Sequence, residues 1–174
     1  ICERGEYRLE SDEVVSIATG LQQAIEGTRH YTPEDFDSLF NRRMELLGQQ
    51  TSSGQLTVRV ENTTTFAAAK SLLSADGAER VVCLHFASAK SPGGGFLSGS
   101  QAQEEALARA SGLYPCINSV QAYYETNRNC GTALYTDHMI YSPDVPVFRD
   151  DDDQLISDPF PVSIITAPAV NRGA

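Results

Sequence analysis

A strand-like run, a triple-glycine loop and a helix start follow one another in the middle of the chain. Residues 81–87 form a near-continuous apolar run of the kind expected for a buried strand, and residues 102–110 are good helix formers. Between them lie Gly93, Gly94 and Gly95, which have no Cβ, so the backbone can take φ > 0 and approach a ligand closely. A strand, a glycine loop and a helix N-terminus in this order can hold a pyrophosphate. The stretch contains neither Gly-x-Gly-x-x-Gly nor Gly-Lys-Ser/Thr, so it is neither a dinucleotide-binding fingerprint nor a P-loop.

The predicted helix opens with three polar residues, Gln103, Glu104 and Glu105, and seven residues separate them from the last glycine. Acidic side chains in a first turn suit the positive end of the helix dipole, and glycines alone are common in loops. Each feature by itself is therefore an ordinary structural device. Their order places two carboxylates at the edge of a glycine-lined loop, which indicates a ligand site.

Three glycines, seven residues and Gln-Glu-Glu are the signature of the poly(ADP-ribose) glycohydrolases, and this chain resembles their microbial type. Further similar stretches are residues 84–92, 107–114, 141–150 and 165–169, so the resemblance covers most of residues 5–170. The resemblance implies an α/β fold, a three-layer α/β/α macrodomain-like architecture with a mixed central sheet. It implies a single catalytic domain over residues 1–174, in which about residues 1–54 are a family-specific extension.

The same resemblance implies an activity and roles for the two glutamates. The family hydrolyses the O-glycosidic ribose–ribose bonds of poly(ADP-ribose) and releases ADP-ribose, with no cofactor and no required metal. Glu105 would protonate the leaving ribose hydroxyl and then deprotonate the incoming water, and Glu104 would hold and orient the substrate. Glycosidic cleavage leaves negative charge on the departing oxygen unless a proton arrives. One carboxyl must therefore be protonated and the other ionised, and burial and like charge raise the pKa of the more buried one.

The resemblance also implies a substrate-binding set. The backbone amides of Gly93, Gly94 and Gly95 would wrap the diphosphate and the distal ribose, and Gln103 belongs to the same set. Phe96 follows the glycines directly and is either a wall of the ribose pocket or a hydrophobic anchor for the loop.

Residues 56–60 alternate like a strand and residues 66–73 read as a helix, so with residues 81–87 they predict a β-α-β unit with parallel strands. In macrodomains the loop after the corresponding strand meets the adenine, which makes Asn62 and Thr63 candidates for substrate binding. The alternative is that the polar run at residues 62–65 serves as a helix cap.

The chain departs from the family pattern in two places. At Ser88 the animal enzymes align an asparagine that contacts the substrate, which puts that contact in doubt. A second phosphate-binding glycine loop follows a strand that corresponds to residues 162–167, and this chain stops at Ala174, before that loop. The chain also lacks an initiator methionine, so we expect a domain that is incomplete at both ends and weaker in binding for that reason.

Composition limits the partners. The chain has 13 basic and 23 acidic residues, a formal net charge of −10, which disfavours direct binding of naked nucleic acid. No apolar run approaches the length of a membrane span.

The four cysteines show no Cys-x-x-Cys pair, so we expect no zinc site and an intracellular location. Residues 150–153 are four aspartates that predict a solvated turn, with a magnesium site as the alternative. Tyr123 and Tyr124 either pack under the catalytic helix or stack on adenine.

The expected partners are therefore poly(ADP-ribose) or ADP-ribosylated proteins, with ADP-ribose as the product ligand. Two alternatives stay open. The same fold could cleave a single ADP-ribose from an arginine or glutamate side chain, because the sequence does not fix the leaving group. It could also be a non-catalytic ADP-ribose-binding module.

Overall fold

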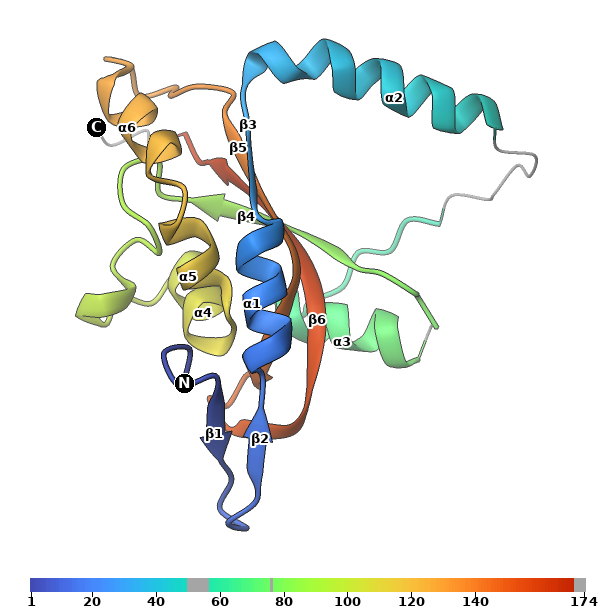
Figure 1. Ribbon diagram of the computed structural model, residues 1–174, viewed down its shortest axis with the longest axis vertical. Coiled ribbons are helices and arrows are strands. Elements are labelled where there is room, and N and C mark those ends of the chain that lie inside the picture. The colour runs from blue at the N-terminus through green and yellow to red at the C-terminus, as the bar shows by residue number, and fades with distance from the viewer. Residues whose placement is uncertain (50–56, 76, 171–174) are drawn as a thin grey trace.

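The computed structural model describes residues 1–49, 57–75 and 77–170, which are built around a mixed four-stranded sheet (Figure 1). The strand order is β3 (Arg29–Tyr31), β5 (Met139–Arg149), β6 (Leu155–Pro168) and β4 (Val82–Ala87). The β5 and β6 strands form a long antiparallel hairpin, β3 joins β5 in antiparallel orientation, and β4 joins β6 in parallel. A separate antiparallel pair consists of β1 (Glu6–Arg8) and β2 (Val14–Ser16).

Helices cover both faces of the central sheet, as the resemblance predicts (Figure 1). One face carries α1 (Ala18–Gly27), α4 (Gln103–Ala110), α5 (Leu113–Asn118) and α6 (Gln121–Asn129), and the other carries α3 (Thr65–Ser74). The long helix α2 (Phe36–Gln49) follows a 3-10 turn, Pro33–Asp35, and extends away from the sheet. A second 3-10 turn, Phe96–Ser98, follows the glycines. The fold is therefore the expected three-layer α/β/α arrangement. Because β3 is part of the sheet and α1 packs on β5, the N-terminal segment is built into it.

The main core lies between the sheet and the helices of the first face. Its fully buried side chains include Leu113, Ile117, Ile140, Val145 and Ile164. Tyr123 and Tyr124 are also fully buried, and their rings meet edge to face with centroids 4.8 Å apart. The prediction that this tyrosine pair packs under the helix is thus confirmed.

The strand and helix expected on either side of the glycine loop are both present, with one correction. Residues 81–87 are strand β4 from Val82 onward, and residues 102–110 are α4 from Gln103 onward. A sequence that is apolar on both faces predicts a strand that is buried throughout. In the structure it is an edge strand with alternating burial, in which Cys83, His85 and Ala87 point inward while Val82, Leu84 and Phe86 are exposed.

The strand predicted at residues 56–60 is wrong for residues 57–60, which form no strand, and Leu56 lies outside the described residues. A physical reason is visible on the free edge of β4. There the side chain of Gln103 accepts a hydrogen bond from the Phe86 N–H at 3.1 Å and donates one to the Leu84 carbonyl at 3.3 Å. An added strand would need the same two backbone groups. The parallel partner of β4 is consequently β6 and not the predicted strand.

The helix predicted at residues 66–73 is α3, and its cap is Thr64. The Thr64 hydroxyl accepts a hydrogen bond from the Ala67 N–H at 3.2 Å and donates to the Asp151 carboxylate at 2.8 Å. One side chain therefore caps α3 and ties it to the turn between β5 and β6.

That turn contains the four aspartates, which are exposed as predicted. The Asp150 side chain accepts hydrogen bonds from the N–H groups of Asp152 and Gln154, which closes the turn locally. Within the described residues no group of three or more His, Cys, Asp or Glu side chains is placed to hold a metal ion. The four cysteines form no disulfide. No helix in the described part of the chain is long and apolar enough to cross a membrane.

The double role of Thr64 leads to a test of stability. We expect Thr64→Ala to lower the free energy of unfolding by about 1 to 2 kcal/mol, because it removes an N-cap together with the contact to Asp151. Thr64→Ser retains the hydroxyl and is the matched control. The measurement is urea unfolding followed by circular dichroism. Equal stability of the two variants would contradict the assigned role of the hydroxyl.

Candidate active site

The glycine loop follows β4 and lies directly on the two glutamate carboxyls. Gly93 has φ +68° and Gly94 has φ +56°, backbone conformations that favour glycine. A Cβ on Gly94 would come within 2.5 Å of Glu105 Oε1 and 2.9 Å of Glu104 Oε2. The absence of a side chain at Gly94 thus lets the main chain approach both carboxyls.

Glu104 is only 6% exposed, and one of its oxygens is held by the start of the loop. Its Oε2 accepts a hydrogen bond from the Ser88 N–H at 2.6 Å. Burial raises the pKa of Glu104 to about 7, against the opposing effect of this backbone donor, and the nearby charge of Glu105 raises it further. Both protonation states of Glu104 are therefore accessible near neutral pH.

Glu105 is as buried as its neighbour, at 7% exposed, but both of its oxygens accept backbone hydrogen bonds. Oε1 accepts from the Gly95 N–H at 2.8 Å, and Oε2 from the Ala102 N–H at 2.9 Å. Burial works to raise the pKa of Glu105, but these donors and the charge of Arg109 outweigh it and lower the pKa below its ordinary value. The two pKa values differ, as expected, but the cause is the backbone donors and not a difference in burial, and the raised pKa belongs to Glu104 and not to the predicted acid Glu105. The acid role assigned to Glu105 therefore requires that its pKa rise when substrate binds.

The predicted substrate-binding residues Gln103, Thr63 and Asn62 lie around the starts of α3 and α4. The amide of Gln103 bonds to the backbone of β4 and donates to the Thr65 hydroxyl at 3.2 Å, so it fixes α4 against β4 and α3. Thr63 lines a cavity of about 500 Å³ beside the first turn of α4, and Asn62 is exposed in the preceding turn. Because Thr64 is the N-cap of α3, capping by Asn62 or Thr63 is not what the structure shows.

Phe96 packs against a residue that the sequence analysis did not single out. Its ring lies 5.3 Å from that of Tyr114, centroid to centroid, and a Cβ on Gly93 would be 3.0 Å from the Tyr114 ring. Tyr114 lies in the first turn of α5, so this contact anchors the glycine loop on that helix. The structure thus shows the anchor role of Phe96, and its role as a wall of the ribose pocket stays a prediction. No local sequence pattern marks Tyr114, because the contact joins residues 18 positions apart.

Ser88 is the position at which the family resemblance implies a departure from the animal enzymes. Its hydroxyl accepts hydrogen bonds from the N–H groups of Lys90 and Ser91, at 3.3 and 3.2 Å, and its own N–H holds Glu104. The Ser88 side chain therefore stabilises the start of the glycine loop through hydrogen bonds to the loop backbone.

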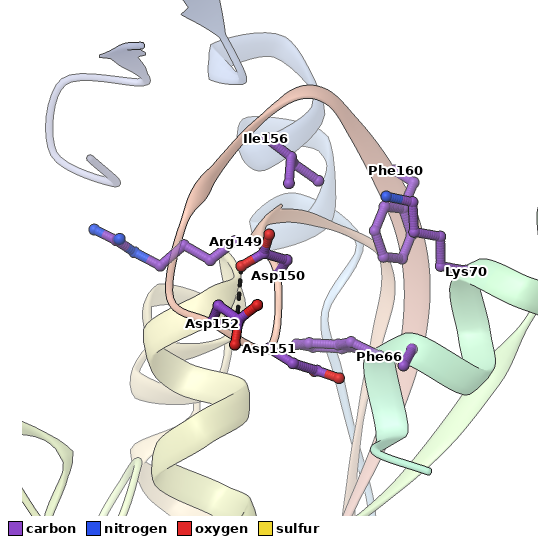
Figure 2. A pocket seen from close by; sticks show the side chains of 9 residues that line it. Phe66, Lys70, Arg149, Asp150, Asp151, Asp152, Ile156 and Phe160 are labelled. Carbon is purple, nitrogen blue, oxygen red and sulfur yellow. Dashed lines mark hydrogen bonds between the residues drawn. The ribbon is translucent and has the colours of Figure 1, made fainter. Parts of the chain in front are cut away.

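A second hollow lies between α3 and the turn that joins β5 to β6 (Figure 2). It has a volume of about 180 Å³; Phe66 and Phe160 contribute aromatic rings and Asp150, Asp151 and Asp152 form an acidic rim. Lys70 places its ammonium 6.0 Å from the centre of the Phe160 ring. None of the lining residues belongs to the glycine loop or to the glutamate pair.

Residues 1–150 match the family described as microbial-type PARG, catalytic domain. The chain belongs to this family. It is similar to the poly(ADP-ribose) glycohydrolase of Thermomonospora curvata bound to the inhibitor ADP-HPD, with 46% identity, a TM-score of 0.87 and coverage of 99% of this chain and 60% of that one. It is also similar to the poly(ADP-ribose) glycohydrolase of Deinococcus radiodurans in complex with ADP-ribose, with 50% identity, a TM-score of 0.76 and coverage of 89% and 59%. No curated protein matches the chain.

The chain thus spans about 60% of the length of these family members. The second phosphate loop that the family resemblance predicts lies outside the described residues. The described end of β6 is held beside β4. Ala87 pairs with Pro168 in the parallel register, and the Ala169 N–H donates to the Ala87 carbonyl at 3.0 Å. The end of β6 therefore lies beside the start of the glycine loop.

The raised pKa of Glu104 predicts a pH effect on stability. The folded protein binds this proton up to a pKa of about 7, whereas the ordinary value is 4.5, so the contribution of Glu104 to the free energy of unfolding falls as pH rises between these values. His85, whose pKa is lowered from 6.5 to about 4, contributes in the opposite direction over an overlapping range, so the comparison is between variants. Relative to the unmutated protein, Glu104→Gln should lose the downward contribution. Glu125→Gln, at an exposed position of α6, is the matched control and should leave it unchanged. Urea unfolding at a series of pH values measures the effect, and parallel curves for Glu104→Gln and the unmutated protein would contradict the assigned pKa.

Proposed function

We propose that this chain provides the glutamate pair and the glycine loop of an enzyme that hydrolyses ribose–ribose O-glycosidic bonds of poly(ADP-ribose) and releases ADP-ribose. The observation that carries the proposal is the contact between the loop backbone and the carboxyls of Glu104 and Glu105. Membership of the family and the ADP-ribose complex of the Deinococcus radiodurans relative support the same substrate class.

The backbone of Gly93, Gly94 and Gly95 would lie along the diphosphate, because main-chain N–H groups can donate to phosphate oxygens without a basic side chain. A diphosphate that takes up the Gly95 N–H would remove one of the two donors that hold Glu105. It would also bring negative charge close to that carboxylate. Both changes raise the pKa of Glu105 and favour its protonation.

Glu105 would then act as acid and base in turn. As the bond between C1″ and the leaving oxygen breaks, the electron pair departs with the oxygen, which takes the proton of Glu105. A water molecule then attacks C1″ and returns a proton to the carboxylate. Glu104 would hold a ribose hydroxyl during both steps.

Replacing the acid tests this mechanism. We expect Glu105→Gln to lower the release of ADP-ribose from auto-modified poly(ADP-ribose) by on the order of 10²-fold or more, with ADP-ribose affinity nearly unchanged. The assay uses the full-length protein that carries this chain, with Glu125→Gln as the control. A glutamine side chain has only one carbonyl oxygen, so its NH2 group must face one of the two backbone N–H donors that bind Glu105. A thermal melt therefore checks that the variant still folds. Turnover close to that of the unmutated protein would remove Glu105 from the mechanism.

The same assay separates the alternatives. Release from mono-ADP-ribosylated protein but not from the polymer would favour a mono-ADP-ribosyl hydrolase. Binding of ADP-ribose in calorimetry without release from either substrate would indicate a binding module.

The loop is tested by two glycines that share a positive φ. Gly94 is at +56° and Gly99 at +86°, but only Gly94 faces the carboxyls, since a Cβ on Gly99 meets nothing within 4 Å. Gly94→Ala should weaken ADP-ribose binding at least about tenfold, because the new Cβ displaces both glutamates. Gly99→Ala carries the same backbone strain without that contact and should bind nearly as the unmutated protein does. Equal affinities in calorimetry would mean that the loop is not the binding surface.

A further inference from the structure

His85 is a buried histidine directly behind the glutamate pair. The alternation of β4 turns it inward, and it is fully buried between β6 and α4. Its neighbour in the parallel register is Thr166, whose hydroxyl lies 3.0 Å from His85 Nδ1. That hydrogen bond fixes the plane of the ring from the side of β6.

The other ring nitrogen points at Glu104. His85 Nε2 lies 3.7 Å from Glu104 Oε1, and neither atom has a hydrogen-bond partner among the described residues. Buried polar atoms without partners are rare and costly in proteins. The opposite oxygen of the same carboxyl is held by the Ser88 N–H. Glu104 therefore lies between the loop backbone, which is bonded to Oε2, and an imidazole whose Nε2 lies 3.7 Å from Oε1, just beyond hydrogen-bond distance.

The chemistry of the three groups allows this contact in both protonation states of Glu104. When Glu104 is protonated, its O–H can donate to His85 Nε2, while the Nδ1–H donates to Thr166. When Glu104 is ionised, the Thr166 hydroxyl can donate to Nδ1, and the Nε2–H then donates to Oε1. A threonine hydroxyl serves either tautomer because it is both donor and acceptor.

The charges around the pair agree with an uncharged histidine. Burial lowers the pKa of His85 to about 4, although the Glu105 carboxylate works to raise it. From α6, the phenols of Tyr123 and Tyr124 are also buried without a hydrogen-bond partner among the described residues, and burial raises their pKa, so they stay neutral. The charge of Glu105 on α4 acts on His85, and the proton that moves near neutral pH belongs to Glu104.

We propose that His85 is a positioning residue that holds Glu104 Oε1 through Nε2, changing its tautomer when Glu104 changes its protonation state. Glu104 then keeps one orientation toward the glycine loop whether it carries a proton or not. The consequence for catalysis rests on the proposed function, because it requires that Glu104 hold the substrate. The contact between His85 and Glu104 does not depend on the proposed function.

The contact is tested without substrate. Nitrogen-15 spectra of the histidine rings distinguish the Nδ1–H tautomer from the Nε2–H tautomer. We expect His85 to change tautomer as the pH rises from about 5 to about 9, and we expect Glu104→Gln to abolish this change. Glu125→Gln should leave it intact. A His85 tautomer that stays the same over this range in the unmutated protein would overturn the proposal.

Activity gives a second, separate readout. His85→Asn keeps a polar atom near Nδ1 for Thr166 but withdraws the group that faces Glu104, whereas His85→Gln reaches the position of Nε2. We expect His85→Asn to lower kcat/KM for ADP-ribose release by about tenfold or more and to change its pH profile, with His85→Gln restoring most of the loss. A role in packing alone would predict equal losses, and that result would overturn the catalytic part.

The spectroscopic and the kinetic experiments test the role of His85 and the proposed function separately. If the unmutated full-length protein releases no ADP-ribose, the proposed function fails, and the tautomer measurement still decides whether His85 holds Glu104. If release is normal and the tautomer does not change, the proposed function stands and the role of His85 is refuted.

Discussion

The loop after β4 depends on carboxylates as hydrogen-bond acceptors. Glu104 receives the Ser88 N–H at the start of the loop, and Glu105 receives the Gly95 N–H at its end. The groups proposed for the chemistry are therefore the same groups that hold the binding surface in place. A change in the charge of either carboxyl changes its strength as an acceptor, so the protonation state and the loop geometry are coupled.

The sheet supplies the frame for this coupling. The parallel pairing of β4 with β6 places His85 opposite Thr166 and Ala87 opposite Pro168. The first pair lies beneath Glu104, and the second brings the end of β6 to the edge from which the glycine loop departs. Because the carboxyl ends of parallel strands meet at one edge of a sheet, a ligand on the loop would also face whatever follows β6.

Local signals in the sequence predict the elements that build the site, and contacts distant in sequence decide how those elements are used. The strand before the glycines, the helix after them and the cap of α3 depend on residues a few positions apart. The missing strand at residues 57–60 has another cause, because Gln103 holds the edge of β4 from 17 positions away. The partner of His85 lies 81 positions along the chain. Adjacent glutamates look alike in a sequence, and only the folded backbone distinguishes them. Glu105 accepts hydrogen bonds from two backbone N–H groups, whereas Oε1 of Glu104 accepts none among the described residues.

Glu105 also caps the helix on which it lies. Ala102 precedes α4 and has no side chain that can cap it, and its N–H is bound by Glu105 Oε2. A protonated carboxyl is a weaker acceptor than an ionised one, so placing a proton on Glu105 weakens the start of α4; losing such a cap entirely costs about 1 kcal/mol. This cost favours the return of Glu105 to its ionised state as soon as the proton can leave. In the proposed mechanism a ligand must therefore supply the free energy that protonates Glu105, and the helix would contribute to driving the proton onto the leaving oxygen.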